Sequence, residues 1–275
     1  MARSIWTGSI SFGLVNVPVS LVSAVRDQGV HFRQLHEKDG APIDTRRFCA
    51  EEDVEVPWEE VVSGYEVKKG KWVTLTDEEL AAAEPRKTKT IDIEEFVDLG
   101  EVDPVYFDHP YFLVPPESEG AARAYRLLVE VMDRTDKVAL GRFVLRTKEY
   151  LVAVRVLDGA LALTTMLFHD EVRPAKGIGP GSAKSTAPAK KEVDAATSVI
   201  DAMTRKWDPS RYDDRHRGRL QKIIRDKKKG RKIKIDEPQD APESVPDLMT
   251  ALEESLARAK KRGGAGSRKR AESAA

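Results

Sequence analysis

Residues 5–19 read Ile5-Trp-Thr-Gly-Ser-Ile-Ser-Phe-Gly-Leu-Val-Asn-Val-Pro-Val19, and this stretch decides the fold. Apolar residues stand at every second position in two successive runs, first Ile10, Phe12 and Leu14, then Val17, Val19 and Leu21. A period of two is that of a β-strand with one buried face. The phase slips by one residue near Asn16, which predicts a bulge or a bend between two strands. We expect Trp6 and Phe12 to lie in the core.

Short strands and a few helices are predicted from here to residue 168. Thr76-Asp-Glu-Glu79 matches a capping box, which predicts a helix over 77–83, and helical spacing of apolar residues predicts another over 119–134. The other predicted elements are a strand over 30–36, a short helix over 58–62 after Pro57, a hairpin around Lys68-Lys69-Gly70-Lys71, and strands over 88–96, 111–114, 138–148, 150–157 and 161–168. Strands at such close spacing predict a mixed, mainly β fold whose antiparallel sheet is closed, or nearly closed, into a barrel.

The composition changes at residue 174. Residues 174–191 are rich in Gly, Pro, Ser and Ala and indicate a flexible linker, so the β-barrel core is expected to cover 1–173. Beyond the linker a helical C-terminal arm is predicted over 192–259, with a helix opening at Asp208-Pro209 and a last helix over 246–259, before a basic, disordered tail over 260–275. Two apolar stripes mark the first part of the arm: Val193, Ala196, Ile200, Met203 and Trp207, then Tyr212, His216, Leu220, Ile223 and Ile224.

Charge is distributed unevenly although the net charge is zero. Residues 1–180 carry 22 Lys or Arg against 31 Asp or Glu, whereas residues 181–275 carry 24 against 15. This asymmetry predicts an acidic folded body and a basic C-terminal region that can meet a polyanion. The single cysteine, Cys49, excludes an intramolecular disulfide and fits a reducing compartment. No apolar run approaches the ~20 residues of a membrane helix, and no signal peptide is evident, so we expect a cytoplasmic, nucleoid-associated protein without a membrane partner.

The sequence lacks the motifs of the common catalytic and metal sites. The linker run Gly-Ser-Ala-Lys-Ser has Ala183 and Ile178 where a phosphate-binding loop needs glycines. No histidine spacing suits zinc, and Cys49 has no nearby Cys or His. A nucleotidyl-transferring ligase needs a lysine two residues before Asp-Gly, where this chain has Glu37 and Val156. We therefore expect no enzyme activity, no cofactor and no metal.

Two basic clusters in the first half are candidates for contact with a phosphate backbone. On the predicted helix 119–134, Arg123, Arg126 and Arg134 fall within a narrow arc that Glu130 shares, and Lys137 follows the helix. On the predicted strand 138–148, one face carries three basic residues: Arg142, Arg146 and Lys148. Basic faces on amphipathic elements are also ordinary solvated surfaces, and the sequence leaves both interpretations open.

The third cluster is denser. Residues 204–234 hold 14 Lys or Arg against 4 Asp or Glu. Like charges repel at helical spacing, so this pattern favours a polyanion or an acidic protein as partner, and Arg215, Arg219 and Lys222 are further DNA-binding candidates. The last helix instead carries an apolar stripe, which can dock in a partner's groove or fold back on its own body, and whose partner-binding candidates are Val245, Leu248, Leu252 and Leu256.

The opening stretch closely resembles the start of bacterial Ku proteins. The similarity continues through Ser63-Gly-Tyr-Glu66, Leu75-Thr-Asp-Glu-Glu-Leu80, Ile93-Glu-Glu-Phe-Val97, Val102-Asp-Pro104, Tyr111-Phe-Leu-Val-Pro115, Tyr125-Arg-Leu-Leu128, Val199-Ile-Asp-Ala-Met203 and Asp208-Pro-Ser-Arg-Tyr212. It spans about residues 3–256. Two departures are visible. Many members carry a Cys-x-x-Cys near Cys49, whereas this chain has Glu52 at the fourth position, so a metal site is not supported there. Residues 155–167 look shorter than usual.

The resemblance implies a Ku-type β-barrel core with a helical C-terminal arm. It implies a homodimer that forms a ring around double-stranded DNA ends and acts in non-homologous end joining. It further implies recruitment of an ATP-dependent ligase, ligase D, through the C-terminal part, and DNA binding through the backbone with little base readout.

Two other functions compete with this reading. One is a sequence-specific DNA-binding regulator that uses the basic helix 209–229, although no helix-turn-helix partner is evident for it. The other is an RNA-binding barrel. The chain lacks the clustered surface aromatics that such modules stack on bases, and its aromatic content is 7%.

Overall fold

The computed structural model describes residues 3–85, 88–176, 178, 188–233 and 249–258. The chain separates into two compact units. The first is formed by residues 1–28 and 32–175, and the second by residues 29–31 and 176–275. Each unit is described by itself.

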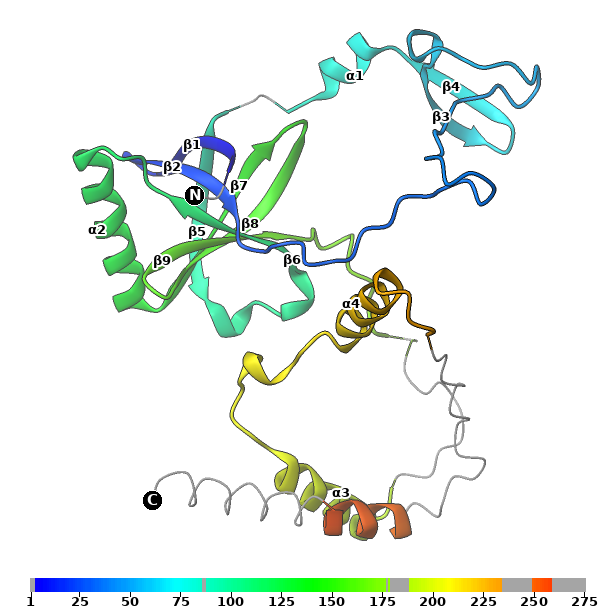
Figure 1. The fold of residues 1–275 in the computed structure, drawn as a ribbon. Helices are drawn as coiled ribbons and strands as arrows, with labels where there is room; N and C mark the ends of the chain where they lie inside the picture. The colour runs from blue at the N-terminus through cyan, green and yellow to red at the C-terminus, as the bar shows by residue number, and fades with distance from the viewer. Residues whose placement is uncertain (1–2, 86–87, 177, 179–187, 234–248, 259–275) are drawn as a thin grey trace. The chain divides into compact units, whose positions relative to one another are not determined.

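A closed seven-stranded β-barrel forms the body of the first unit (Figure 1). Its strands are β1 (Ser4–Phe12), β2 (Val15–Ser23), β5 (Thr90–Asp98), β6 (Phe107–Val114), β7 (Lys137–Leu145), β8 (Lys148–Leu157) and β9 (Ala160–Met166). They follow one another around the barrel as β1-β2-β6-β9-β8-β7-β5. All neighbours are antiparallel except β1 and β5, which pair in parallel and close the ring. Closure leaves no unpaired sheet edge. The predicted mixed, mainly β barrel is confirmed.

The opening stretch forms the β1–β2 hairpin. Its bend is a two-residue turn, Gly13-Leu14, slightly earlier than the bend predicted near Asn16. Phe12 pairs with Val15 across this turn, so both side chains share a face and the apolar phase shifts by one residue. Gly13 has a φ of +58°, which glycine adopts without strain. The predicted core positions hold in part, because Trp6 and Phe12 are half-buried against the core.

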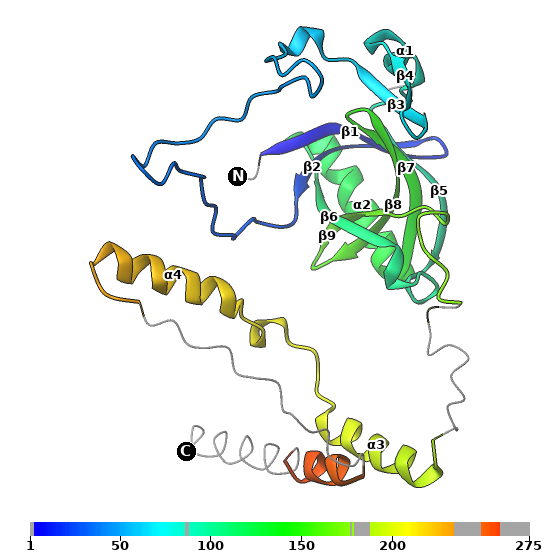
Figure 2. The same cartoon turned by 90° about the vertical axis from the view of Figure 1, so that its right-hand side faces the viewer.

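Helix α2 (Glu119–Thr135) closes one end of the barrel. It contacts β2 on one side of the ring and β7 and β8 on the other, and Figure 2 shows it beside these strands. The helix buries Ala121, Tyr125, Leu128 and Met132, four residues at the predicted spacing. The Tyr125 hydroxyl donates to the Leu113 carbonyl at 2.8 Å and accepts the Leu161 amide proton at 2.8 Å. This buried phenol therefore ties the helix to β6 and β9.

Residues between β5 and β6 cover part of the outer barrel surface. They include two 3₁₀ turns, η2 (Leu99–Glu101) and η3 (Pro104–Tyr106). A second apolar cluster forms here, in which Val102, Tyr106 and Phe107 pack against Val138, Ala153 and Met166. Side chains on both faces of β7 and β8, toward the barrel interior and toward its outer surface, are thus partly buried. This burial explains the high apolar content of these two strands.

Between β2 and β5 the chain forms a hairpin and a short helix. The hairpin joins β3 (Ser63–Lys68) to β4 (Lys71–Leu75), and α1 (Asp77–Ala83) follows from N-cap Thr76 with the predicted capping box. A 3₁₀ turn, η1 (Trp58–Glu60), stands where a short helix was predicted. The strand predicted over 30–36 is wrong. Only Leu35 makes a bridge, to Pro42, because the neighbouring amides are used in a local turn rather than in a ladder.

The second unit is helical, as predicted. It contains α3 (Lys190–Met203), the 3₁₀ turn η4 (Pro209–Arg211), α4 (Arg215–Lys228) and a helical stretch over 249–258. α3 begins two residues inside the predicted linker, most of which lies outside the described residues. Asp208-Pro209 opens only the single turn η4. The longer helix starts from a second N-cap, Asp214, whose carboxylate accepts the Arg217 amide proton at 2.9 Å. The tail 260–275 also lies outside the described residues.

Candidate functional site

The solvent face of α2 carries the first predicted basic cluster. Arg123 and Arg126 are exposed, opposite the buried face, as the spacing predicts. Arg134 is different, because its Nη2 lies 2.6 Å from Oε1 of Glu130. Within the part of the chain that the structure describes, Arg123 and Arg126 form no ion pair with a carboxylate. The helix therefore offers two uncompensated cations rather than three.

Lys137 and Arg142 lie at the start and in the middle of β7, and both are held by acids of neighbouring strands. Lys137 Nζ donates to Asp98 Oδ1 at 2.6 Å, and this hydrogen bond raises the pKa of Lys137. Arg142 donates from Nε to Glu94 at 3.0 Å and from Nη1 to Glu149 at 3.2 Å. This part of the barrel surface thus alternates in charge, and a phosphate must displace carboxylates in order to bind here.

The predicted strand 138–148 is wrong in its last three residues. β7 ends at Leu145, Arg146-Thr147 form a two-residue turn in which Arg146 has a φ of +63°, and Lys148 opens β8. Arg and Thr are not turn residues by composition, so the alternating pattern runs through the turn unmarked. Arg146 and Lys148 consequently stand at a hairpin tip, where Lys148 Nζ lies 5.2 Å from the Tyr150 ring centroid. They do not share a strand face with Arg142.

Helix α4 carries the densest positive charge of the three predicted clusters. Its residues include seven Lys or Arg against one acid, Asp226, and none of its residues is buried. The predicted candidates Arg215, Arg219 and Lys222 are all exposed. Asp226 is engaged by Arg231, whose Nη1 lies 3.5 Å from its Oδ1. All seven positive charges on α4 therefore lack an ion pair with an acid of the same helix, which is the pattern that a polyanion neutralises.

Only part of the predicted partner-binding stripe is described. Leu252 and Leu256 lie in the helical stretch 249–258 and are partly buried. Val245 and Leu248 lie outside the described residues. Whether this stripe faces a partner stays a prediction.

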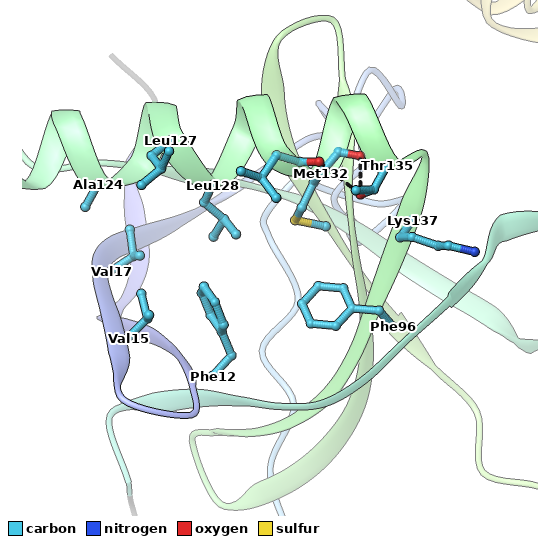
Figure 3. Close-up of a pocket in the computed structure, with 11 residues that line it drawn as sticks. Phe12, Val15, Val17, Phe96, Ala124, Leu127, Leu128, Met132, Thr135 and Lys137 are labelled. Atoms are coloured by element: carbon cyan, nitrogen blue, oxygen red, sulfur yellow. Dashed lines mark hydrogen bonds between the residues drawn. The ribbon is translucent and has the colours of Figure 1, made fainter.

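An apolar pocket of about 570 Å³, which the sequence analysis missed, lies between α2 and the β1–β2 hairpin (Figure 3). Phe12 and Phe96 meet edge-on at its floor, with ring centroids 6.3 Å apart. Leu127 and Val131 line it from α2 and are 62% and 49% exposed. Leu127 does not belong to the set of α2 residues that are buried in the core. An apolar residue at such an exposed position of the helix is the sequence signal that indicates the pocket. The pocket can bury apolar groups but holds no catalytic constellation.

The segment around Cys49 contains two turns with the same hydrogen bonds. The amides of His36 and Cys49 each donate to the carbonyl five residues later, and the amides of Gly40 and Asp53 donate back. His36 Nδ1 pairs with Asp39 Oδ1 at 3.0 Å. Across the described ranges, no three His, Cys, Asp or Glu side chains gather closely enough to hold a metal ion. No helix among the described residues is long and apolar enough to span a bilayer.

Residues 11–195 match the family model described as the Ku70/Ku80 beta-barrel domain, which covers most of the barrel unit and the start of α3. The chain belongs to the Ku family. The predicted family is thereby confirmed.

Relatives in the Ku family align along nearly the whole chain. The non-homologous end joining protein Ku of Anaeromyxobacter sp. (strain K) is 44% identical over 96% of this chain and 88% of its own length. Ku 1 of Geotalea uraniireducens is 42% identical over 94% and 98%, and Ku of Bacillus subtilis is 36% identical over 94% and 83%. Both units therefore have counterparts in these relatives.

Proposed function

We propose that this chain binds the ends of double-stranded DNA in non-homologous end joining, encircles them as a homodimeric ring, recruits the ATP-dependent ligase D, and catalyses no reaction itself. The observation that carries the proposal is α4, with seven cations, one acid and no buried residue, in a chain whose relatives are named for end joining. DNA breaks arise at any base sequence, so a protein that binds broken ends must bind without recognising particular bases. The phosphate backbone is a polyanion with the same charge at every sequence, and it is therefore the part of DNA that such a protein must bind.

Exposed apolar surfaces among the described residues support the assembly part of the proposal. The barrel presents the pocket at Leu127 and Val131, and α3 presents Ile200 and Met203, which are 65% and 64% exposed. Apolar surface of this extent is characteristic of protein interfaces. A second copy would bury such surface in a homodimer, and the C-terminal stripe that includes Leu252 and Leu256 would remain for the ligase.

Binding to linear and to covalently closed circular DNA of the same sequence tests end loading. A ring that loads at ends is retained on linear DNA at a salt concentration that removes it from circles. Log affinity should also fall steeply with log salt, because binding releases condensed counterions. Equal retention on both substrates would rule out the ring.

A matched variant ties binding to α4. Arg219→Gln with Lys222→Gln removes two exposed charges and should make the salt slope shallower by about two, one for each lost phosphate contact. The alternative, a sequence-specific regulator using 209–229, predicts instead a strong preference for one duplex sequence among many. A competition series with unrelated duplexes separates the two functions.

A further inference from the structure

Two aromatic rings stack on each other in the segment between α3 and α4, which is yellow in Figure 1. The ring centroids of Trp207 and Tyr212 lie 5.3 Å apart, and the ring planes are inclined by 27°. The sequence pattern places these two residues on separate helical stripes. In the structure α3 ends at Met203 and α4 begins at Arg215, so both rings lie outside the two helices. The fold therefore joins them into one surface feature that neither stripe predicts.

The turn η4 holds the two rings together. The Asp208 carboxylate accepts the amide and the hydroxyl protons of Ser210, at 3.1 and 2.7 Å. Pro209 restricts its own φ, and its carbonyl accepts the Tyr212 amide proton at 3.2 Å. Trp207 and Tyr212 thus lie at the two ends of a hydrogen-bonded turn. Because the pair is already ordered, a ligand that binds to it loses little further conformational entropy.

Both rings of the pair are open to solvent. Trp207 is 72% exposed and Tyr212 is 70% exposed. Each ring uses one face in the stack, and among the residues that the structure describes no further ring or cation lies over the other face. An aromatic face stacks favourably on another flat conjugated ring. The pair can therefore accept such a ring on either outer side.

Three cations are immediate neighbours of the two rings in the sequence: Arg205, Lys206 and Arg211. All three are exposed, and within the described ranges none forms an ion pair with a carboxylate. Of the acids close by, Asp208 and Asp214 accept hydrogen bonds from amides of the turns that they cap. Exposed aromatic rings next to cations are the pattern that binds single-stranded nucleic acid, because bases stack on the rings while phosphates meet the cations. A purely apolar partner would gain nothing from these cations.

From this arrangement we infer that Trp207 and Tyr212 form a stacking site for an unpaired base at a single-stranded overhang of the DNA end. The neighbouring cations contact the phosphates of the same overhang. The inference rests on the proposed function and extends it from the duplex to the unpaired bases of an end that is not blunt. The site accepts any base, because every base has a π face. It lies on the same stretch of chain as α4, which begins three residues after Tyr212.

The test uses the full chain and DNA ligands that share one duplex. One ligand is blunt, one carries an overhang of thymidines, and one carries an overhang of equal length made of abasic nucleotides. Overhangs on the 3′ and on the 5′ strand are both measured. The abasic overhang has the same phosphates but no bases, so the thymidine overhang should bind on the order of tenfold more tightly, as expected for stacking of a single base. Equal affinity for thymidine and abasic overhangs of both polarities would overturn the inference.

Variants of the wild-type rings separate base stacking from apolar burial. Trp207→Leu keeps an apolar side chain but removes the ring, so it should abolish the preference for thymidine over abasic overhangs and leave the affinity for blunt duplex unchanged. Trp207→Phe keeps a ring and should retain most of the preference. Trp58→Leu is the matched control, because Trp58 is 65% exposed and has Arg47 over its ring but lies in the first unit. A wild-type preference in Trp207→Leu, or the same loss in Trp58→Leu, contradicts the assignment.

Photocross-linking of the wild-type protein to an overhang that contains iodouracil needs no variant. Mass spectrometry should locate the cross-links at Trp207 or Tyr212, and cross-links found only elsewhere would count against the site.

A protein interface is the alternative role of the pair. If Trp207→Leu changes the oligomeric state in sedimentation and weakens binding to blunt and overhanging ends alike, the rings contact a second copy and the inference is wrong. In each of these outcomes, wild-type protein that binds blunt linear duplex leaves the proposed function intact. Failure of the wild-type protein to bind linear duplex at all would instead overturn the proposed function.

Discussion

The Nε of Arg142 in β7 lies 3.0 Å from Oε1 of Glu94 in β5. Glu149 of β8 holds the same guanidinium from the other side at 3.2 Å, and both carboxylates raise the pKa of Arg142. A cation that is neutralised in place contributes little to counterion release. Arg142→Gln should therefore change the salt slope of DNA binding by well under one unit, whereas Arg219→Gln in α4 should lower it by about one.

Removal of the acids should act in the opposite direction. Glu94→Gln with Glu149→Gln frees Arg142 and deletes two negative charges from the barrel surface, so affinity for linear duplex should rise at low salt. Both measurements use the same fluorescence titration. If Arg142→Gln costs as much as Arg219→Gln, then the guanidinium leaves its carboxylates for a phosphate when DNA binds.

Gly8 stands where β1 approaches β5, and we expect Gly8→Ala to destabilise the barrel. A Cβ at this position would lie 2.2 Å from the Lys89 carbonyl oxygen and 2.4 Å from the Trp6 ring. The carbonyl is fixed because it accepts the Ser9 amide proton at 2.9 Å. Overpacking of this kind costs about 1–3 kcal/mol or more, measured by urea unfolding. Gly100→Ala is the control, since no atom beyond its two chain neighbours lies within 4 Å of its added Cβ. Equal stability of both variants would show that β1 and β5 can separate freely.

The hydroxyl group of Tyr125 should stabilise the fold in addition to the burial of its ring. Tyr125→Phe leaves the Leu113 carbonyl and the Leu161 amide without their partner at a residue that is 7% exposed, so the free energy of unfolding should fall by about 1–3 kcal/mol. Burial also raises the pKa of Tyr125. Stability from a raised pKa is full below the unfolded value near 10 and is lost as pH rises through the folded value. Tyr125→Phe should remove this alkaline loss, whereas the exposed Tyr212→Phe should change neither quantity.

Helices and turns were predictable from the sequence where a short motif is typical of a single local structure. The Thr76–Glu79 capping box and the burial stripe through Tyr125 and Leu128 specify α1 and α2 from sequence neighbours alone. The hairpin turn at Arg146-Thr147 was not predictable, because neither residue marks a turn and the tight loop is imposed by the pairing of β7 with β8.

The candidate site was harder to predict because charge compensation acts over long sequence distances. Arg142 and Glu94 are 48 residues apart and meet only through the β5–β7 register. Helical spacing placed Arg123 and Arg126 on the solvent face correctly, but it carries no information about carboxylates on other strands. The positive charge of α4 was predictable from composition alone. The helix contains seven cations and one acid, so its net charge can be read without knowing which distant carboxylates lie nearby.

The C-terminal segments should have separable roles. Deletion of residues 260–275 removes a basic stretch and should weaken DNA binding while the thermal transition of the protein stays unchanged. Deletion of 246–259 removes the stripe at Leu252 and Leu256 but keeps α4, and should abolish stimulation of the ligase in a joining assay. Full stimulation by the second truncation would remove the partner assignment. A lost thermal transition in the first would show that the tail contributes to folding.

Asp214 connects the order of α4 to its proposed role. Its carboxylate caps the helix by accepting the Arg217 amide proton, and this hydrogen bond lowers the pKa of Asp214. Stability from a lowered pKa is full above the unfolded value of about 3.9 and is lost as pH falls through the folded value. The first turn of α4 should therefore fray on acidification, which the NMR chemical shift of the Arg217 amide would report. Asp214→Asn, which caps the helix without titrating, should remove that pH dependence.

Asp214→Ala should fray the first turn of α4 at neutral pH. It also removes a negative charge, so charge alone predicts tighter DNA binding, whereas loss of helical order predicts weaker binding. We expect weaker binding, and a tighter complex would show that the number of cations, rather than their arrangement on a helix, determines the affinity.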